Sequence, residues 1–163
     1  MYNQTLCFVK RNNELLMLNR EYAPMQGLWN GVGGKMTDGE SPLECIVREI
    51  EEETGITVPH EAMLDKGVIT WVIDNHLTGG LYVFQVNLDK EYTYTTPRAT
   101  NEGILDWKKL PWLLTEDNFG VGEMLPHYLP ILLGDNNRYH HHCTIEKSTL
   151  TAYKYSRLEA API

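Results

Sequence analysis

The chain has few basic residues, few cysteines and no long apolar run. It carries 14 Lys and Arg against 22 Asp and Glu, which gives a formal net charge of −8. A general nucleic-acid-binding surface needs clustered Lys and Arg, so this balance argues against one. An anionic substrate would have to be drawn in by a metal ion and a few local cations.

The three cysteines and the lack of membrane-type segments bear on location. Cys7, Cys45 and Cys143 are odd in number and follow no metal-ligand spacing, which predicts reduced thiols. We expect neither a signal peptide nor a membrane-spanning segment, because no apolar run is long enough to cross a bilayer. These features predict a cytoplasmic protein with no membrane partner, and they leave the oligomeric state open.

The order of the predicted elements favours a mixed α/β arrangement in one domain. The chain has 163 residues and no repeat or low-complexity segment, so we expect a single domain over residues 1–163. Strands are predicted for residues 5–10, 15–18, 67–73, 81–88, 103–108, 140–145 and 150–158. Residues 89–101 are predicted to form a loop. A short helix is expected to begin near Pro126, because Pro126 and Pro130 would break or kink a longer one.

One helix is marked at both ends by its sequence. Ser41 and Glu44 have capping-box spacing, and Pro42 falls at the first helical position. Gly55 supplies the stop. An apolar stripe at helical spacing predicts packing against a core, and it consists of Leu43, Ile46, Val47 and Ile50.

The other face of this helix concentrates negative charge. Glu49, Glu52 and Glu53 lie three and four residues apart, where like charges repel by about 0.2–0.5 kcal/mol per pair. In a last turn they also meet the negative end of the helix dipole, at about 0.3–1 kcal/mol each. A divalent cation would reverse both terms, since Mg²⁺ prefers carboxylate oxygens and keeps waters that a phosphate can replace. A solvated acidic face is the alternative interpretation.

The segment before the helix is rich in glycine. Three glycines occur in four positions, Gly31, Gly33 and Gly34, and they predict a shaped loop whose backbone approaches a ligand, an ion or the packed helix. Arg20 ends the preceding strand. It could contact a phosphate or lie in solvent.

The whole string from Gly34 to Ile56 resembles the Nudix signature, in which glycine, five residues, glutamate and seven residues precede Arg-Glu-aliphatic-x-Glu-Glu-x-Gly-aliphatic. Every constrained position is filled, by Gly34, Glu40, Arg48, Glu49, Ile50, Glu52, Glu53, Gly55 and Ile56. The resemblance implies an α/β/α sandwich around a mixed sheet. It also implies Mg²⁺- or Mn²⁺-dependent cleavage of nucleoside diphosphates linked to another group. Residues 29–35 look like the MutT-type nucleoside triphosphatases, including those that remove 8-oxo-dGTP.

The resemblance implies a metal site and a catalytic base. The metal ligands would be three helix carboxylates and one backbone carbonyl, those of Glu49, Glu52, Glu53 and Gly33. Arg48 would orient the carboxylates through charge-assisted hydrogen bonds. Residues 101–107 resemble the loop that supplies a late carboxylate in those enzymes, here Glu102. Water would attack a phosphoanhydride phosphorus, and either Glu102 or Glu49 would take its proton.

The predicted substrate contacts lie outside the helix. Two cations would meet substrate phosphate, Lys35 and Arg20. Three box residues would mainly shape the loop and helix, Gly34, Glu40 and Gly55. Asn30 presents a donor and an acceptor, so its amide can pair with a purine edge that carries a carbonyl beside an N–H. Tyr22 and Trp29 would stack or form walls, although a core position is the stronger expectation for Trp29.

These assignments predict Mg²⁺-dependent hydrolysis of a nucleoside triphosphate to a monophosphate and pyrophosphate, with purines, including 8-oxo-dGTP, as candidate substrates. The acidic pair that reads purines in some relatives is not recognisable, and Asp117 and Glu123 are the only candidate stand-ins. One alternative is hydrolysis of ADP-ribose, a dinucleotide or a capped RNA 5′ end. Another is a non-catalytic nucleotide sensor; such proteins commonly lose box carboxylates, and none is lost here.

Three consecutive histidines invite a metal-site interpretation. Because neighbours on a strand point to opposite faces, only His140 and His142 could share an ion. No complete ligand set accompanies them. We therefore expect His140, His141 and His142 to be ordinary strand residues.

Overall fold

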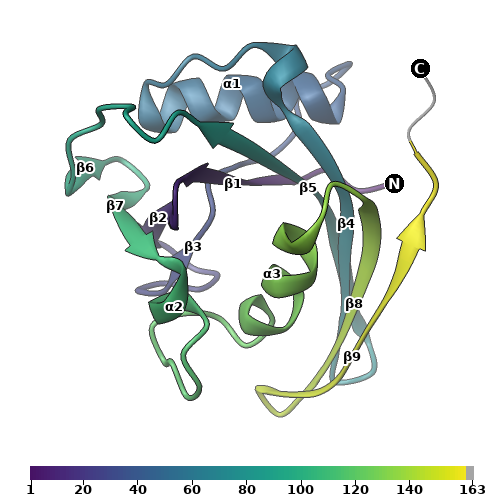
Figure 1. The fold of residues 1–163 in the computed structure, drawn as a ribbon. Helices are drawn as coiled ribbons and strands as arrows, with labels where there is room; N and C mark the ends of the chain where they lie inside the picture. The colour runs from purple at the N-terminus through teal and green to yellow at the C-terminus, as the bar shows by residue number, and fades with distance from the viewer. Residues whose placement is uncertain (161–163) are drawn as a thin grey trace.

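A computed structural model describes residues 1–160 of the chain. Within these residues nine strands form one sheet, with eight in the order β6-β7-β2-β1-β5-β4-β8-β9 and β3 paired with β2 (Figure 1). The strands are β1 Thr5–Arg11, β2 Glu14–Arg20, β3 Trp29–Asn30, β4 Leu64–Ile73, β5 Leu77–Leu88, β6 Arg98–Thr100, β7 Gly103–Lys109, β8 Arg138–Glu146 and β9 Thr149–Leu158. The helices are α1 Pro42–Thr54, α2 Leu110–Leu113 and α3 Leu125–Gly134, with a short 3-10 helix His60–Ala62.

The sheet is mixed, and helices cover both of its faces. β1 runs parallel to β5 and β4 runs parallel to β8, while the other pairs are antiparallel. Alternate residues of β1 enter two separate cores, because side chains along a strand point to opposite faces. Cys7 and Val9 lie in the core on the α1 side, whereas Leu6 and Phe8 lie in the core that includes α3. The predicted α/β/α sandwich is confirmed.

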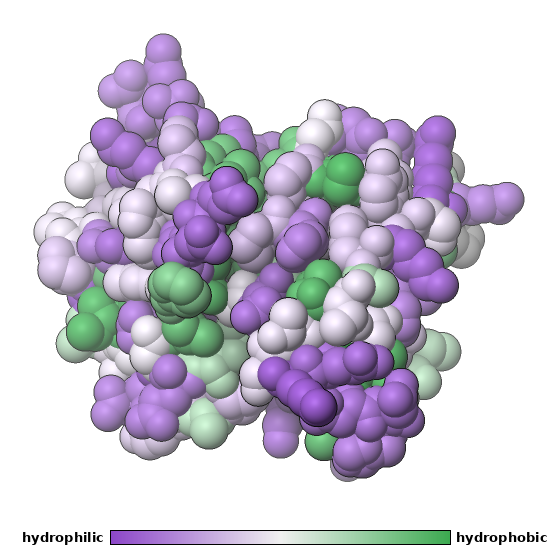
Figure 2. Space-filling model, turned by 90° about the horizontal axis from the view of Figure 1, so that it is seen from below, coloured by the Kyte–Doolittle hydropathy of each residue, from purple (hydrophilic) through white to green (hydrophobic). Residues whose placement is uncertain are grey.

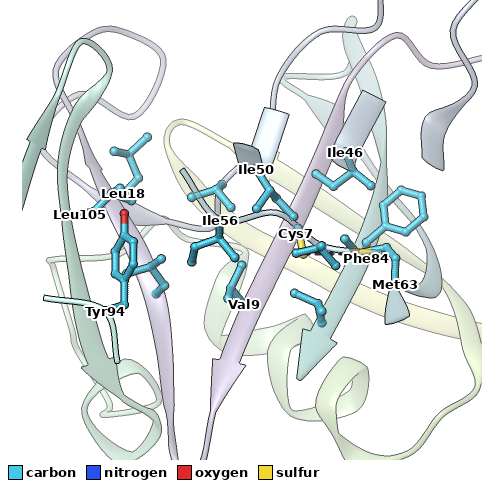
Figure 3. Close-up of a cluster of buried hydrophobic side chains, with 14 residues drawn as sticks. Cys7, Val9, Leu18, Ile46, Ile50, Ile56, Met63, Phe84, Tyr94 and Leu105 are labelled. Carbon is cyan, nitrogen blue, oxygen red and sulfur yellow. Dashed lines mark hydrogen bonds between the residues drawn. The ribbon is translucent and has the colours of Figure 1, made fainter. Parts of the chain in front are cut away.

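Helix α1 has the ends and the buried face that its sequence predicts. Ser41 accepts a hydrogen bond from the Glu44 N–H, the Glu44 side chain accepts from the Ser41 N–H, and Gly55 adopts φ 79° at the C-cap. Ile46 and Ile50 point from α1 into the core around β1 (Figure 3). This packing fixes the rotation of α1 about its axis, and so decides which carboxylates face the glycine-rich loop.

Most predicted strands are confirmed, and several boundaries were wrong. Arg98–Thr100, predicted as loop, forms β6, whose three residues are stabilised by pairing with β7 rather than by any local pattern. The β4–β5 turn is shorter than predicted, because Asp74 and Asn75 adopt positive φ while Gly79 and Gly80 continue the strand. A side chain at Gly79 would collide with the Trp71 ring.

The helical part of the C-terminal third also differs from the prediction. α3 begins at Leu125, next to Pro126 as expected, but it continues through Pro130 to Gly134. Burial of Tyr128, Leu129 and Leu132 offsets the backbone hydrogen bond that Pro130 cannot donate. The four-residue α2 was not predicted. None of the helices in residues 1–160 is long and apolar enough to cross a membrane.

The face that carries α2 and α3 is chemically mixed. Seen from this side, apolar residues form small patches separated by hydrophilic ones (Figure 2). The part of this face built by residues 1–160 therefore presents no single broad apolar surface of the kind that marks a large protein interface.

Candidate active site

The glycine-rich loop lies directly against β1 and the acidic face of α1. The Thr5 N–H donates to the Gly34 carbonyl at 2.9 Å, and the Gly33 N–H donates to Glu53 Oε2 at 3.3 Å. A Cβ on Gly33 would lie 2.1 Å from the Thr5 carbonyl oxygen, and one on Gly34 would lie 2.4 Å from the Glu49 carboxyl carbon. At Gly33 only glycine allows this approach, because the obstacle is backbone, whereas a side chain at Gly34 would displace the Glu49 carboxylate. The loop backbone thus meets both Glu49 and Glu53.

Arg48 ties the acidic residues of the signature together. Its guanidinium donates to both carboxylate oxygens of Glu40, at 2.7 and 2.9 Å, and to Glu49 Oε1 at 2.9 Å and Glu52 Oε2 at 3.1 Å. It also donates to the Lys35 carbonyl at 3.1 Å. Hydrogen bonds from Arg48 and from the Thr37 N–H lower the pKa of Glu40 to about 2. Glu40 thus anchors Arg48, and Arg48 in turn orients Glu49 and Glu52.

Glu53 lies outside the Arg48 network and accepts a hydrogen bond from the Gly33 N–H instead. Burial, followed by the negative charge of Glu49, raises the pKa of Glu53 to about 8; the charge of Glu102 adds to the shift and that of Arg20 opposes it. Burial also raises the pKa of Glu49. The fold therefore brings Glu102 and Arg20, from the β6–β7 turn and the end of β2, within electrostatic reach of Glu53.

The donor set suits a hard divalent cation. Carboxylate and backbone carbonyl oxygens are the ligands that Mg²⁺ and Mn²⁺ take, and a bound cation would offset the charge that Glu49, Glu53 and Glu102 impose on one another. In residues 1–160 no three acidic, histidine or cysteine side chains converge as a preformed ligand group. Glu52 is turned to Arg48, but its side chain is 58% exposed, so it has room to turn toward an ion beside Glu53.

The predicted substrate residues differ in their exposure and in their contacts. Lys35 and Tyr22 are exposed, while Arg20 donates from Nε to the Pro24 carbonyl at 2.7 Å. Asn30 is half-buried, and its amide oxygen accepts from the Gly31 N–H at 2.9 Å while its amide nitrogen lies 3.8 Å from Met25 Sδ. Trp29 packs against the core on the α3 side.

Glu102 is exposed, and the backbone on both sides of it is fixed. Its N–H donates to Thr100 Oγ1 at 3.1 Å, and its carbonyl accepts from the Glu21 N–H at 2.9 Å. A Cβ on Gly103 would overlap the Asn19 carbonyl oxygen, so only glycine brings this turn against the end of β2. The residue that sequence reasoning missed is Thr5, which binds Gly34 but belongs to no motif; its strand position gave no signal of this contact.

The three histidines behave as strand residues. His140 Nε2 and His142 Nδ1 each lie 2.7 Å from Thr70 Oγ1, and buried His141 contacts the Tyr153 hydroxyl at 2.8 Å through Nδ1. His141 lies on the opposite face, as alternation requires. All three cysteines are free, as predicted, and they are also buried.

Replacing Glu53 by glutamine is expected to stabilise the metal-free protein at pH 8. Since the folded-state pKa of Glu53 is raised from 4.5 to about 8, the native state binds this proton more tightly than the unfolded state, and stability falls as pH rises between these values. Glutamine removes the half-buried charge of Glu53 and keeps an oxygen that can accept from the Gly33 N–H. We expect a Tm gain over wild type of about 2–4 °C at pH 8, in EDTA, and little gain at pH 4.5. An equal difference at both pH values would contradict this account.

The fold and this constellation define a class. The sequence signature implied a three-layer sandwich, and the structure has one. In it, α1 carries glutamates that are hydrogen-bonded to Arg48, and this helix lies against the glycine-rich loop. A family model for the NUDIX domain matches residues 2–127. The chain belongs to the Nudix family, and its class is that of the Nudix hydrolases.

The individual relatives differ in the substrates that their names give. The uncharacterized Nudix hydrolase YvcI of Bacillus subtilis is 33% identical over 105 residues, 63% of this chain and 63% of the relative. The 8-oxo-dGTP diphosphatase of Proteus vulgaris is 36% identical over 69 residues, 42% and 61% of the two chains. The ADP-ribose pyrophosphatase of Methanocaldococcus jannaschii is 34% identical over 56 residues, 34% and 33%. These matches span less than two thirds of each of these curated relatives.

The similarity to a solved structure extends over nearly the whole chain. A MutT protein from Bacillus halodurans has a TM-score of 0.75 and 27% identity, over 95% of this chain and 97% of that one. The shared fold therefore includes elements beyond residue 127, where the family model ends.

Proposed function

We propose that the protein hydrolyses a phosphoanhydride bond of a nucleoside triphosphate, releasing a nucleoside monophosphate and pyrophosphate, with Mg²⁺ or Mn²⁺ as cofactor. The observation that carries this proposal is the half-buried Glu53 carboxylate, which accepts from the Gly33 N–H and lies close enough to Glu49 for the two negative charges to repel. A divalent cation and a polyphosphate complete such a site, because the cation offsets the carboxylates and binds phosphate oxygens.

The residues have separable roles in this mechanism. Glu49, Glu52, Glu53 and the Gly33 carbonyl would hold the cation, which stabilises charge on the transferred group and the leaving oxygen. Arg48 holds Glu49 in position from its anchor on Glu40, and Glu52 would turn from Arg48 toward the ion. Lys35 and Arg20 would contact phosphate, and Glu102 or Glu49 would take the proton of the attacking water.

We propose purine triphosphates, with guanine or 8-oxoguanine as the base, as the preferred substrates. The similarity to an 8-oxo-dGTP diphosphatase supports this choice, and the half-buried amide of Asn30 offers a means of reading the base. ADP-ribose is the second candidate, supported by the similarity to an ADP-ribose pyrophosphatase. It contains the same diphosphate that the box would bind, so the substrate panel must include it.

Asn30→Ala is expected to narrow the preference for purines over pyrimidines. An amide left unpaired by the wrong base costs about 1–3 kcal/mol, so wild type should prefer dGTP and 8-oxo-dGTP over dCTP by about tenfold or more. The measurement is kcat/KM for dGTP, 8-oxo-dGTP, dATP, dCTP and ADP-ribose in both proteins. If wild type shows no purine preference, or the variant lowers every substrate by one factor, Asn30 does not read the base. Faster turnover of ADP-ribose would favour the second candidate.

We further propose that the chain forms one domain over residues 1–163 and acts in the cytoplasm on small nucleotides. One continuous sheet from β6 to β9 supports the single domain within residues 1–160. Three free, buried thiols and the lack of disulfides in the described chain are typical of a reducing compartment. The net charge of −8 supports a small-molecule substrate rather than a nucleic acid.

A further inference from the structure

Thr5 lies behind the catalytic loop, although it is not part of the signature. It is the first residue of β1 and is 4% exposed. Its backbone N–H donates to the Gly34 carbonyl at 2.9 Å, and its hydroxyl lies 3.2 Å from the same oxygen. One carbonyl thus takes two hydrogen bonds from a single residue, which restricts the Gly34 peptide more than the backbone bond alone would.

The direction of the protons follows from simple valence. A carbonyl oxygen can only accept, so the single hydroxyl proton of Thr5 goes to Gly34. Thr5 Oγ1 also lies 3.2 Å from Sγ of Cys45 on α1, and the same Sγ lies 3.8 Å from the Gly34 carbonyl oxygen, so the thiol proton can go to either oxygen. Burial raises the pKa of Cys45, which keeps the S–H proton in place. The mutual contacts of the Cys45 thiol, the Thr5 hydroxyl and the Gly34 carbonyl join α1, β1 and the glycine-rich loop.

The same loop is confined from its other side by the carboxylates of α1. The Gly33 N–H donates to Glu53 Oε2 at 3.3 Å, and the Glu49 carboxylate fills the space beside Gly34. Cys45 lies one turn before Glu49, so both project from neighbouring positions on one side of α1. Any shift of the Gly33–Gly34 backbone toward Thr5 would therefore change its spacing to Glu49 and Glu53.

We propose that Thr5 is a positioning residue, whose hydroxyl fixes the Gly33–Gly34 backbone relative to Glu49 and Glu53 and so sets the divalent-cation affinity of the site. The proposal rests on the proposed function, because that function supplies the cation. Groups that hold metal ligands in place commonly change metal affinity by about 10–100-fold when they are removed. The hydroxyl of Thr5 acts on the Gly34 carbonyl, one peptide away from the proposed backbone ligand, the Gly33 carbonyl.

The test compares three variants of the full chain by Mn²⁺ binding, measured by electron paramagnetic resonance without substrate. Thr5→Val keeps the shape and removes the hydroxyl, and it is expected to weaken Mn²⁺ binding by about tenfold. Thr5→Ser keeps the hydroxyl and should bind Mn²⁺ like wild type. Thr70→Val is the matched control, since Thr70 is also buried and its hydroxyl contacts His140 and His142 of β8, away from the carboxylates.

Turnover provides a second measurement. In Thr5→Val the Mg²⁺ concentration for half-maximal rate should rise by the same factor, while KM for the nucleotide at saturating Mg²⁺ stays unchanged. Equal Mn²⁺ affinity in Thr5→Val and wild type would overturn the proposal, and so would a Thr5→Ser variant as weak as Thr5→Val. If Thr5→Val does not fold, Cys45→Ala tests the same group of contacts by removing the thiol that α1 contributes. It should weaken Mn²⁺ binding to a smaller degree, and unchanged binding would overturn the proposal.

The two proposals fail in different ways. A wild-type protein that neither binds Mn²⁺ nor cleaves any nucleotide would remove the proposed function, and the role of Thr5 with it. A wild-type protein that does both, alongside an unchanged Thr5→Val variant, would remove only the role of Thr5.

Discussion

Glu53→Gln and Glu52→Gln are each expected to lower turnover by at least about 100-fold, which corresponds to about 2.7 kcal/mol of transition-state stabilisation. Glutamine keeps the size of the side chain but loses the charge that binds a cation, so charge on the transferred phosphoryl group and the leaving oxygen is stabilised less. The measurement is kcat at saturating nucleotide over a Mg²⁺ titration that extends to limiting concentrations.

Glu51→Gln is the matched control for this pair. Glu51 belongs to the same turn of α1 and is exposed, but its side chain makes no hydrogen bond or ion pair in the described structure. The Glu51→Gln variant should keep wild-type kcat and Mg²⁺ dependence. Near-normal rates in both Glu52→Gln and Glu53→Gln at limiting Mg²⁺ would contradict the assignment of these carboxylates to the metal.

Glu102→Gln should lower kcat with little change in KM, and should flatten the acid limb of the pH–rate profile, if Glu102 is the general base. General-base catalysis contributes about 10²–10⁴-fold, so the fall in kcat should lie in that range. The exposed Glu102 is held on a fixed turn, and its charge is close enough to Glu53 to contribute to the raised pKa of that carboxyl.

If Glu49 is the general base instead, the change in the pH–rate profile should appear in Glu49→Gln. Glu49 is half-buried and its Oε1 accepts from Arg48, so Glu49→Gln should alter both metal dependence and the pH–rate profile if it takes the proton. Glu91→Gln, at an exposed loop position before β6, serves as the control that changes charge alone. An unaltered pH profile in Glu102→Gln would remove Glu102 from the mechanism.

Features encoded by neighbouring residues could be predicted from the sequence. The two ends of α1 follow from Ser41, Glu44 and Gly55, whose side-chain and backbone hydrogen bonds are local. The β1–β2 hairpin follows from two apolar runs separated by a turn-rich break, and the apolar face of α1 follows from helical periodicity. The acidic face of α1 could also be predicted, because the spacing of the glutamates along the helix is enough to bring their charges together.

Features that depend on distant residues could not be predicted. β6 exists because β7 pairs with it, and α3 continues past Pro130 because its neighbours are buried. The contact between Thr5 and Gly34 joins positions 29 residues apart. The approach of Glu102 to Glu53 likewise requires β7 to pair with β2, and only the family resemblance pointed to it.

The most direct test of the central claim is the metal dependence of hydrolysis by wild-type protein stripped with EDTA. The protein is mixed with dGTP or 8-oxo-dGTP, Mg²⁺ is added back in steps, and monophosphate and pyrophosphate are quantified. The account predicts no turnover without metal and a saturable rise with Mg²⁺ that yields equal amounts of the two products. Hydrolysis that proceeds unchanged in EDTA, or release of inorganic phosphate instead of pyrophosphate, would contradict it.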